Sequence, residues 1–232
     1  MYARAAARVN VATGVPNAWN PEFNSSVRAI DAREDGSRIY FAGFFSTSRT
    51  FQTPYAAAVH PDAAATLDPW TPTWSQTGQT YQQTILSTDD SVWVGGAEHS
   101  WFQFDAETYA RGVGHIANPK GDFQASTRSN GIMYATCHCW DFLYQGSYTW
   151  PSVGTGWTRA TGINGIGAWD EATGRHLEAF KPETSQRAGS GPWAVKIASD
   201  GTLWMGGDIV GGRTGSGNRW LGGFARYPQR DA

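Results

Sequence analysis

Cys137-His138-Cys139 is the densest group of thiol and imidazole side chains in the sequence, and three chemistries are open to it. In a continuous strand, which rises about 3.3 Å per residue, the two cysteine Cα atoms would lie about 6.5 to 7 Å apart. That separation is at the upper limit for a disulfide unless the backbone bends. A structural zinc site needs four ligands, and the sequence has no second cysteine pair. We favour unpaired cysteines over a local disulfide, and a disulfide over a metal site.

A long segment, residues 138–164, collects large aromatic side chains among glycine, serine and threonine. Exposed, such rings would suit stacking on sugars or anchoring a protein partner, because Trp and Tyr combine apolar area with a polar group. We favour the alternative that they fold over the protein as a small additional core, since a loop this long needs packing of its own. The ligand-binding candidates are Trp140, Tyr144, Tyr148, Trp150 and Trp157 from this segment, with Asp208 and Arg213 from a later loop.

Catalytic signatures are weak. Residues 199–204 are similar to the aspartate box of sialidase-type proteins, but they lack its spacing residue between Asp and Gly. The glycine-rich residues 211–217 follow no strand-to-helix pattern, so we interpret them as a flexible loop rather than a phosphate-binding loop. No GxSxG or HExxH motif occurs. We therefore predict no cofactor and name no catalytic residue.

The composition of the chain argues against some classes of function. The net charge is −2 and the 18 basic residues are scattered, so we expect no nucleic-acid binding. No segment approaches the roughly 20 apolar residues that span a bilayer, so we expect no direct membrane insertion. The first ten residues have no apolar central region and do not look like a signal peptide. Because the chain begins with a strand-like segment at residues 7–11, we expect it to be a piece of something longer.

Four copies of one pattern organise the chain. In each copy, a turn-forming pair precedes a short apolar strand that ends in glycine or cysteine. The predicted strands are residues 39–43, 92–96, 132–137 and 203–207, and their aromatic residues are Tyr40, Trp93, Tyr134 and Trp204. Further strands are predicted at residues 55–60, 101–105, 166–170 and 221–227. An aromatic residue followed two positions later by proline closes three units, at Trp19, Trp70 and Phe180.

Units of about 40 to 50 residues with four strands each are typical of β-propeller blades. We therefore predict an all-β chain, a β-propeller of about four to five four-stranded blades, either a small ring or a section of a larger propeller. A sandwich is the main structural alternative. The expected single domain divides into a partial blade at 1–22, blades at 23–76 and 77–121, a blade with the long insertion at 122–190, and a blade at 191–232 that lacks its last strand.

Connectivity predicts two different ends for such units. The tight turns joining strands one to two and three to four should lie at one end of each blade, and the longer loops at the other. Binding residues are most often carried by loops on a rigid scaffold. The loop-rich end, with residues 44–54, 97–100, 138–164 and 208–219, is therefore the predicted functional surface.

The chain resembles the bacterial Delta-60-repeat β-propeller-like proteins. The matching pieces are Asp200-Gly201 with Trp204-Met205-Gly206-Gly207, Ala12-Thr13-Gly14 with Trp19-Asn20-Pro21, and Ala172-Thr173-Gly174. The third unit departs from this pattern, because Cys137 stands in place of glycine and a long insertion follows. The resemblance implies a fold and an extracellular or cell-surface location, without implying one activity.

We expect a non-catalytic extracellular module that binds a carbohydrate or protein ligand through aromatic loops, and the sequence does not predict its oligomeric state. The alternative is a propeller enzyme, either a glycan-active hydrolase or lyase or a quinone-dependent oxidoreductase. Its acid and base would then come from different blades. Desolvated carboxylates at a channel mouth would favour the enzyme, and an exposed row of aromatic rings would favour binding.

Overall fold

The computed structural model describes residues 2–74, 80–118, 121–148, 156–187, 190–214 and 217–228. Over these residues the protein contains twenty β-strands and no helix, and every strand pairing is antiparallel. The expectation of an all-β chain is confirmed. Within the same residues, no helix has the length and apolar character that a membrane crossing requires.

Four sheets, which we call repeat sheets one to four, follow one another along the chain. Repeat sheet one contains β1 (Val27–Ala32), β2 (Ile39–Gly43) and β5 (Ala56–Val59). Repeat sheet two contains β6 (Gln82–Ser87), β7 (Ser91–Gly96), β8 (Ser100–Asp105) and β9 (Arg111–Asn118). Repeat sheet three contains β10 (Phe123–Ser129), β11 (Ile132–Cys137) and β14 (Ile166–Asp170). Repeat sheet four contains β16 (Pro192–Ile197), β17 (Leu203–Gly207) and β20 (Phe224–Tyr227).

The remaining strands lie outside this pattern. β3 (Thr47–Ser48) and β4 (Phe51–Gln52) form a small hairpin. β12 (Phe142–Gln145) and β13 (Arg159–Gly162) extend repeat sheet two beyond β9. β15 (Thr184–Gln186), β18 (Ile209–Thr214) and β19 (Gly217–Trp220) form a separate three-stranded sheet.

The repeat sheets share their register as well as their strand order. The first strand of each has a bulge or register shift near its start, opposite the end of the second strand. The second-strand aromatics Tyr40, Trp93, Tyr134 and Trp204 occupy equivalent positions, opposite Asp31, Leu86, Thr127 and Lys196. Gly36, Gly131 and Gly201 have φ values of 72°, 72° and 78°, a left-handed conformation that favours glycine. The sequence repeat is therefore a repeat of structure.

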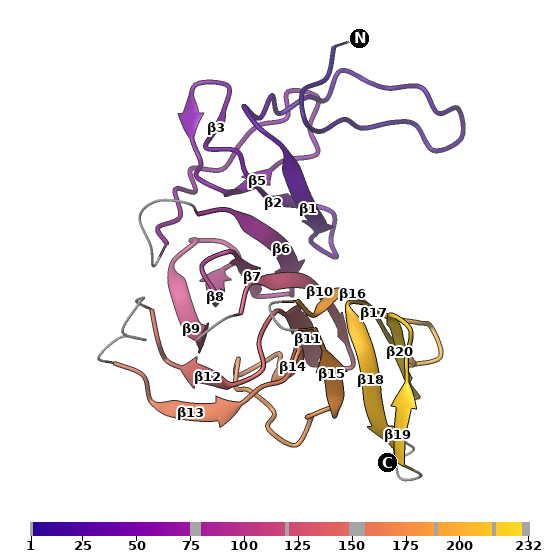
Figure 1. Ribbon diagram of the computed structural model, residues 1–232. Helices are drawn as coiled ribbons and strands as arrows, with labels where there is room; N and C mark the ends of the chain where they lie inside the picture. Colours follow the sequence, from indigo (N-terminus) through magenta and orange to yellow (C-terminus); the bar gives the residue numbers. More distant parts are fainter. Residues whose placement is uncertain are drawn as a thin grey trace.

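Neighbouring repeat sheets meet along their first strands, β1 against β6, β6 against β10 and β10 against β16. Polar bonds join these strands: the Ser87 N–H donates to Asp31 Oδ2 (2.7 Å), and the hydroxyls of Thr84 and Ser126 lie 2.6 Å apart. Apolar clusters fill the spaces between successive sheets, and the sheets follow one another in an arc in Figure 1. No strand pairing joins repeat sheet four to repeat sheet one among the described residues.

The predicted N-terminal strand at residues 7–11 is wrong, since the structure has there only the isolated bridge between Val9 and Pro16. The segment lies instead on the outer side of repeat sheet one. Trp19 stacks near Phe41, with ring centroids 6.0 Å apart, and its Nε1–H donates to the His60 carbonyl (2.9 Å). Trp19 thus packs on repeat sheet one and does not lie beside repeat sheet four.

The two classes of tight turn lie at one end of the repeat sheets. The Ala106 N–H donates to the Asp90 carbonyl (3.0 Å), and the Glu171 N–H donates to the Gly131 carbonyl (2.9 Å). These bonds join the turn between strands one and two to the turn that follows strand three. The longer connections that follow strand two, including the insertion, therefore start from the opposite end.

Candidate binding surface

The insertion after β11 is anchored as two strands on the neighbouring repeat sheet, which the sequence did not predict. β12 pairs with β9, with Leu143 opposite Ala117 and Tyr144 opposite Ile116. Leu143 is fully buried in the cluster between repeat sheets two and three. Because successive strand residues point to opposite faces, burial of Leu143 sends Phe142 and Tyr144 to the other face of the sheet.

That other face carries an aromatic strip, which we define as Phe142, Tyr144, Tyr148 and Trp157. The ring centroids of Phe142 and Tyr144 lie 6.3 Å apart, and those of Tyr144 and Trp157 lie 5.5 Å apart in an edge-on arrangement. Phe142 is 47 % exposed and Trp157 46 % exposed. These distances are in the range for interacting aromatic pairs, so the rings of Phe142, Tyr144 and Trp157 form one surface.

Tyr148 extends the strip along β9. Its hydroxyl donates to the Gly112 carbonyl (2.8 Å), and its ring centroid lies 6.1 Å from that of Phe102. A side chain at Gly114 would collide with the Tyr148 ring, because an added Cβ would lie 2.6 Å from a ring carbon. Glycine at position 114 thus makes the space in which Tyr148 lies flat against the sheet.

Arg111 supplies a cationic group beside the strip. Its guanidinium lies 4.6 Å from the Phe102 ring centroid, a distance typical of a cation–π contact. One guanidinium nitrogen also donates to the Thr73 hydroxyl (3.3 Å). Burial lowers the pKa of Arg111, which Glu98 partly opposes. The surface thus combines flat apolar rings with fixed hydrogen-bond donors.

The predicted ligand-binding residues are dispersed. Tyr144, Tyr148 and Trp157 lie in the strip, while Trp140 is partly exposed just after the second cysteine. Trp150 lies outside the described residues. Phe142, which was not among those candidates, completes the strip. The signal available in the sequence was its alternation with Leu143.

Asp208 and Arg213 are engaged elsewhere. The Arg187 side chain donates to both carboxylate oxygens of Asp208 (2.7 and 2.9 Å) and lowers the pKa of that acid. Arg213 lies on β18, where it faces Glu183 at 3.5 Å. Neither residue is part of the aromatic strip as defined, so the structure does not unite the predicted candidates into one site.

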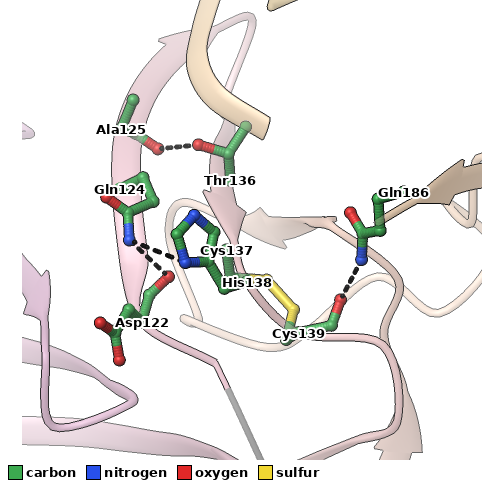
Figure 2. The surroundings of a disulfide bond; sticks show 8 residues. All are labelled: Asp122, Gln124, Ala125, Thr136, Cys137, His138, Cys139 and Gln186. Atoms are coloured by element: carbon green, nitrogen blue, oxygen red, sulfur yellow. Dashed lines mark hydrogen bonds between the residues drawn. A yellow bond between two sulfur atoms is a disulfide. The ribbon is translucent and has the colours of Figure 1, made fainter. Parts of the chain in front are cut away.

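Cys137 and Cys139 form a disulfide, with His138 between them (Figure 2). Their Cα atoms are 5.1 Å apart, closer than in a continuous strand, because β11 ends at Cys137 and the chain bends. The structure therefore holds the local disulfide rather than the unpaired cysteines that we favoured. No cluster of three or more metal-ligating side chains occurs in the described ranges.

Two acidic groups at the loop end are paired with basic ones. His99 Nε2 lies 3.1 Å from Asp122 Oδ1, and Asp208 is held by Arg187. Burial raises the pKa of the Asp31 carboxyl, and the hydrogen bonds from the Ser87 and Ala32 N–H groups only partly oppose this shift. Asp31 lies on β1 near the tight-turn end, away from the loops. Glu98, in the loop at residues 97–100, is 1 % exposed and accepts a hydrogen bond from the Gln82 side-chain amide (2.7 Å). The loop end thus has one buried carboxylate beside these ion pairs.

Comparisons with known proteins identify no family. No protein-family model matches the chain, and no curated protein is similar to it. Among solved structures, one described as "Structure of U3-55K" is similar over 87 % of this chain and 67 % of its own, with 9 % sequence identity and a TM-score of 0.45.

Proposed function

We propose that this protein is a non-catalytic binding module built as an arc of β-propeller blades. Three features support the propeller interpretation: four antiparallel meanders, one register with the same bulge in each, and first strands that lie side by side. Propeller blades are arranged around a central channel in this way. Blades packed against one another form a rigid frame, which suits presentation of a surface rather than movement.

The ligand that we propose is a carbohydrate, bound on the aromatic strip. The observation that carries this proposal is the row in which the partly buried Tyr144 lies between the exposed rings of Phe142 and Trp157. Flat rings accept the apolar C–H faces of sugar rings, while Arg111 and the tyrosine hydroxyls offer hydrogen-bonding groups to sugar oxygens. β12 holds the Phe142 and Tyr144 rings more precisely than a flexible loop would.

An extracellular or cell-surface location is part of the proposal. It rests on the family resemblance and on the Cys137–Cys139 disulfide, because disulfides persist mainly in oxidising compartments outside the cytosol. A protein of the cell surface would meet polysaccharides there.

A glycan array tests the proposed function. The parent protein should bind at least one glycan class, and Phe142→Ala combined with Trp157→Ala should weaken that binding at least 10-fold. Trp220→Ala is the matched control, because Trp220 is 82 % exposed on β19, outside the strip, and its loss should leave glycan binding unchanged. Circular dichroism would verify that each variant is folded. Absence of glycan binding by the parent, or equal binding by the double variant, would contradict the proposal and favour a protein ligand.

A further inference from the structure

The aromatic strip follows β9 and ends beside Arg111. Tyr144 lies opposite Ile116, and the Tyr148 hydroxyl donates to the Gly112 carbonyl (2.8 Å), next to Arg111 in the chain. From position 116 to position 111 the strand rises roughly 16 Å, at about 3.3 Å per residue. A strip of this length is longer than one sugar ring, so it suits a chain of sugars.

Arg111 is a half-buried cation without a carboxylate partner among the described residues. Its guanidinium donates to the Thr73 hydroxyl (3.3 Å) and lies over the Phe102 ring. Residues 75–79, 119–120 and 149–155, which lie outside the described ranges, include no aspartate or glutamate. A guanidinium has five N–H donors, so Arg111 keeps donors for a ligand.

The burial of Arg111 is not offset by an ion pair in the part of the chain that the structure describes. Burial lowers the pKa of Arg111, although attraction to Glu98 and Tyr148 opposes this shift. Arg33 behaves differently, because its hydrogen bond to Glu107 raises its pKa. A charge that loses water without gaining a counter-ion lowers stability. The position of Arg111 therefore favours a ligand that supplies the counter-ion.

Lys181 supplies a second cation, at the Phe142 end of the strip. Gly162 on β13 lies opposite Phe142, and a Cβ added at Gly162 would lie 2.8 Å from Lys181 Nζ. Directly opposed residues of an antiparallel pair point to the same face, so the ammonium lies on the side of β13 to which Phe142 points. Lys181 forms no ion pair within the described ranges. An exposed lysine adds little affinity by itself, but it gives the strip a cation at each end.

Glu98, the acid that attracts Arg111, is covered by protein. It is 1 % exposed, and one of its carboxylate oxygens accepts a hydrogen bond from the Gln82 side chain (2.7 Å). The aromatic strip itself contains no acidic residue. A ligand that lies along the strip therefore meets a cation at each end and aromatic rings between them.

We infer that the carbohydrate bound on the aromatic strip is acidic, a chain of sugars whose anionic groups, carboxylate or sulfate, bind Arg111 and Lys181. This inference rests on the proposed function. The Arg111 guanidinium is planar and can donate two parallel hydrogen bonds to one anionic group. Its bond to Thr73 and its stacking on Phe102 hold it in one place, so the anion meets a positioned group rather than a mobile surface charge.

The test uses the full chain and immobilised polysaccharides, with binding measured by biolayer interferometry. Polygalacturonate and alginate carry carboxylates, dextran sulfate carries sulfates, and methyl-esterified polygalacturonate and dextran are neutral. The parent protein should bind at least one acidic polymer about 10-fold more tightly than the neutral ones, because hydrogen bonds to charged groups are stronger than neutral ones. Binding of the carboxylated polymers without dextran sulfate assigns the anion as a carboxylate, and the reverse assigns it as a sulfate.

Substitutions in the protein locate the anion. Arg111→Gln should weaken binding of the acidic polymer about 10-fold and leave binding of the neutral polymers unchanged. Arg111→Lys should keep only part of the affinity, since lysine lacks the planar fork. Lys181→Gln should have a smaller effect than Arg111→Gln, because Lys181 is exposed. Arg28→Gln is the matched control, since it removes an exposed arginine from β1, outside the strip, and circular dichroism would verify folding.

Each result separates this inference from the proposed function. Equal affinity of the parent for acidic and neutral polymers would overturn the inference and leave the proposed function standing. A preference for acidic polymers that persists in Arg111→Gln would also overturn it, because another group would then bind the anion. If the parent binds none of these polymers, the inference is overturned, and the glycan array decides separately whether the proposed function stands.

Discussion

Trp93 and Trp204 occupy the same register position in repeat sheets two and four, yet their surroundings are opposite. Trp93 is completely buried, with Trp101 and His115 stacked near it at centroid distances of 5.5 and 6.0 Å. Trp204 is 43 % exposed beside Arg226. The strand places the ring, and the neighbouring sheet decides whether the ring is buried.

The cross-strand neighbours of the two tryptophans carry part of this difference. Trp93 lies between Leu86 and Gln103, whereas Trp204 lies between Lys196 and Arg226. Long cationic side chains keep their charged ends in water while their stems cover apolar surface. Lys196 and Arg226 therefore suit a face that is in contact with water.

Replacement of each tryptophan by alanine is the strongest test of this contrast. Trp93→Ala should lower the free energy of unfolding by about 3 to 5 kcal/mol, because it leaves a cavity between repeat sheets two and three. Trp204→Ala should change it by less than about 1 kcal/mol, because solvent already reaches the ring. Urea unfolding followed by circular dichroism measures both values. Equal losses would mean that Trp204 is buried in solution.

Low pH should lower the free energy of unfolding through two buried histidines, His115 and His176. Burial lowers the pKa of His115 to about 3, although the hydrogen bond to the Gly174 carbonyl opposes this shift. Burial also lowers the pKa of His176 to about 4. Between pH about 6.5 and about 4, the unfolded chain binds protons at both histidines and the folded protein does not. The free energy of unfolding should therefore fall with decreasing pH, by about 1.4 kcal/mol per pH unit for each histidine.

Urea unfolding at a series of pH values checks this acid effect. His176→Asn should remove the contribution of one histidine, about 1.4 kcal/mol per pH unit, from the slope between pH about 6.5 and about 4. A slope identical to that of the parent would show that His176 is already protonated, or exposed, in the folded protein.

Gly95 and Gly206 occupy the same register position in repeat sheets two and four. Their replacement by alanine should give the smallest of the three differences in stability. A Cβ at Gly95 would lie 2.8 Å from the Phe123 Cβ of the next sheet, whereas a Cβ at Gly206 would have its nearest neighbour, a Phe224 ring carbon, at 3.5 Å. Gly95→Ala should cost about 1 to 3 kcal/mol through overpacking. Gly206→Ala should be neutral or stabilise the protein by up to about 1 kcal/mol, since glycine weakens a strand. Thermal unfolding of the two variants and the parent measures these changes. If Gly206→Ala also destabilised the protein, the face of repeat sheet four that carries Gly206 would be covered in solution.

Strand positions were the most predictable part of the fold. The predicted strands at residues 39–43, 132–137 and 203–207 coincide with β2, β11 and β17. Each follows a turn with a glycine in the left-handed region, so the signal is local and strong. The strand expected at residues 7–11 fails because its valines find no neighbouring strand there beyond a single bridge.

The aromatic strip was predictable only in part. Its rings lie in the insertion that the sequence marked as unusual, but their alignment depends on pairing of β12 with β9. That pairing joins residues more than 20 positions apart, and neither strand carries a turn signal that would reveal it. The buried Leu143, which fixes which face the rings occupy, is an ordinary residue in the sequence.

The amino-acid sequence by itself determined the strands, the glycine turns and the repeat, because these depend on preferences of a few adjacent residues. It also placed an aromatic residue at one position in the second strand of each repeat sheet. The tertiary structure alone decided that Tyr40 and Trp93 are buried and Trp204 is open, and that Cys137 and Cys139 are joined. Burial and disulfide bonding depend on which surfaces come into contact when the chain folds. These contacts join residues from different parts of the fold, so a local sequence pattern does not predict them.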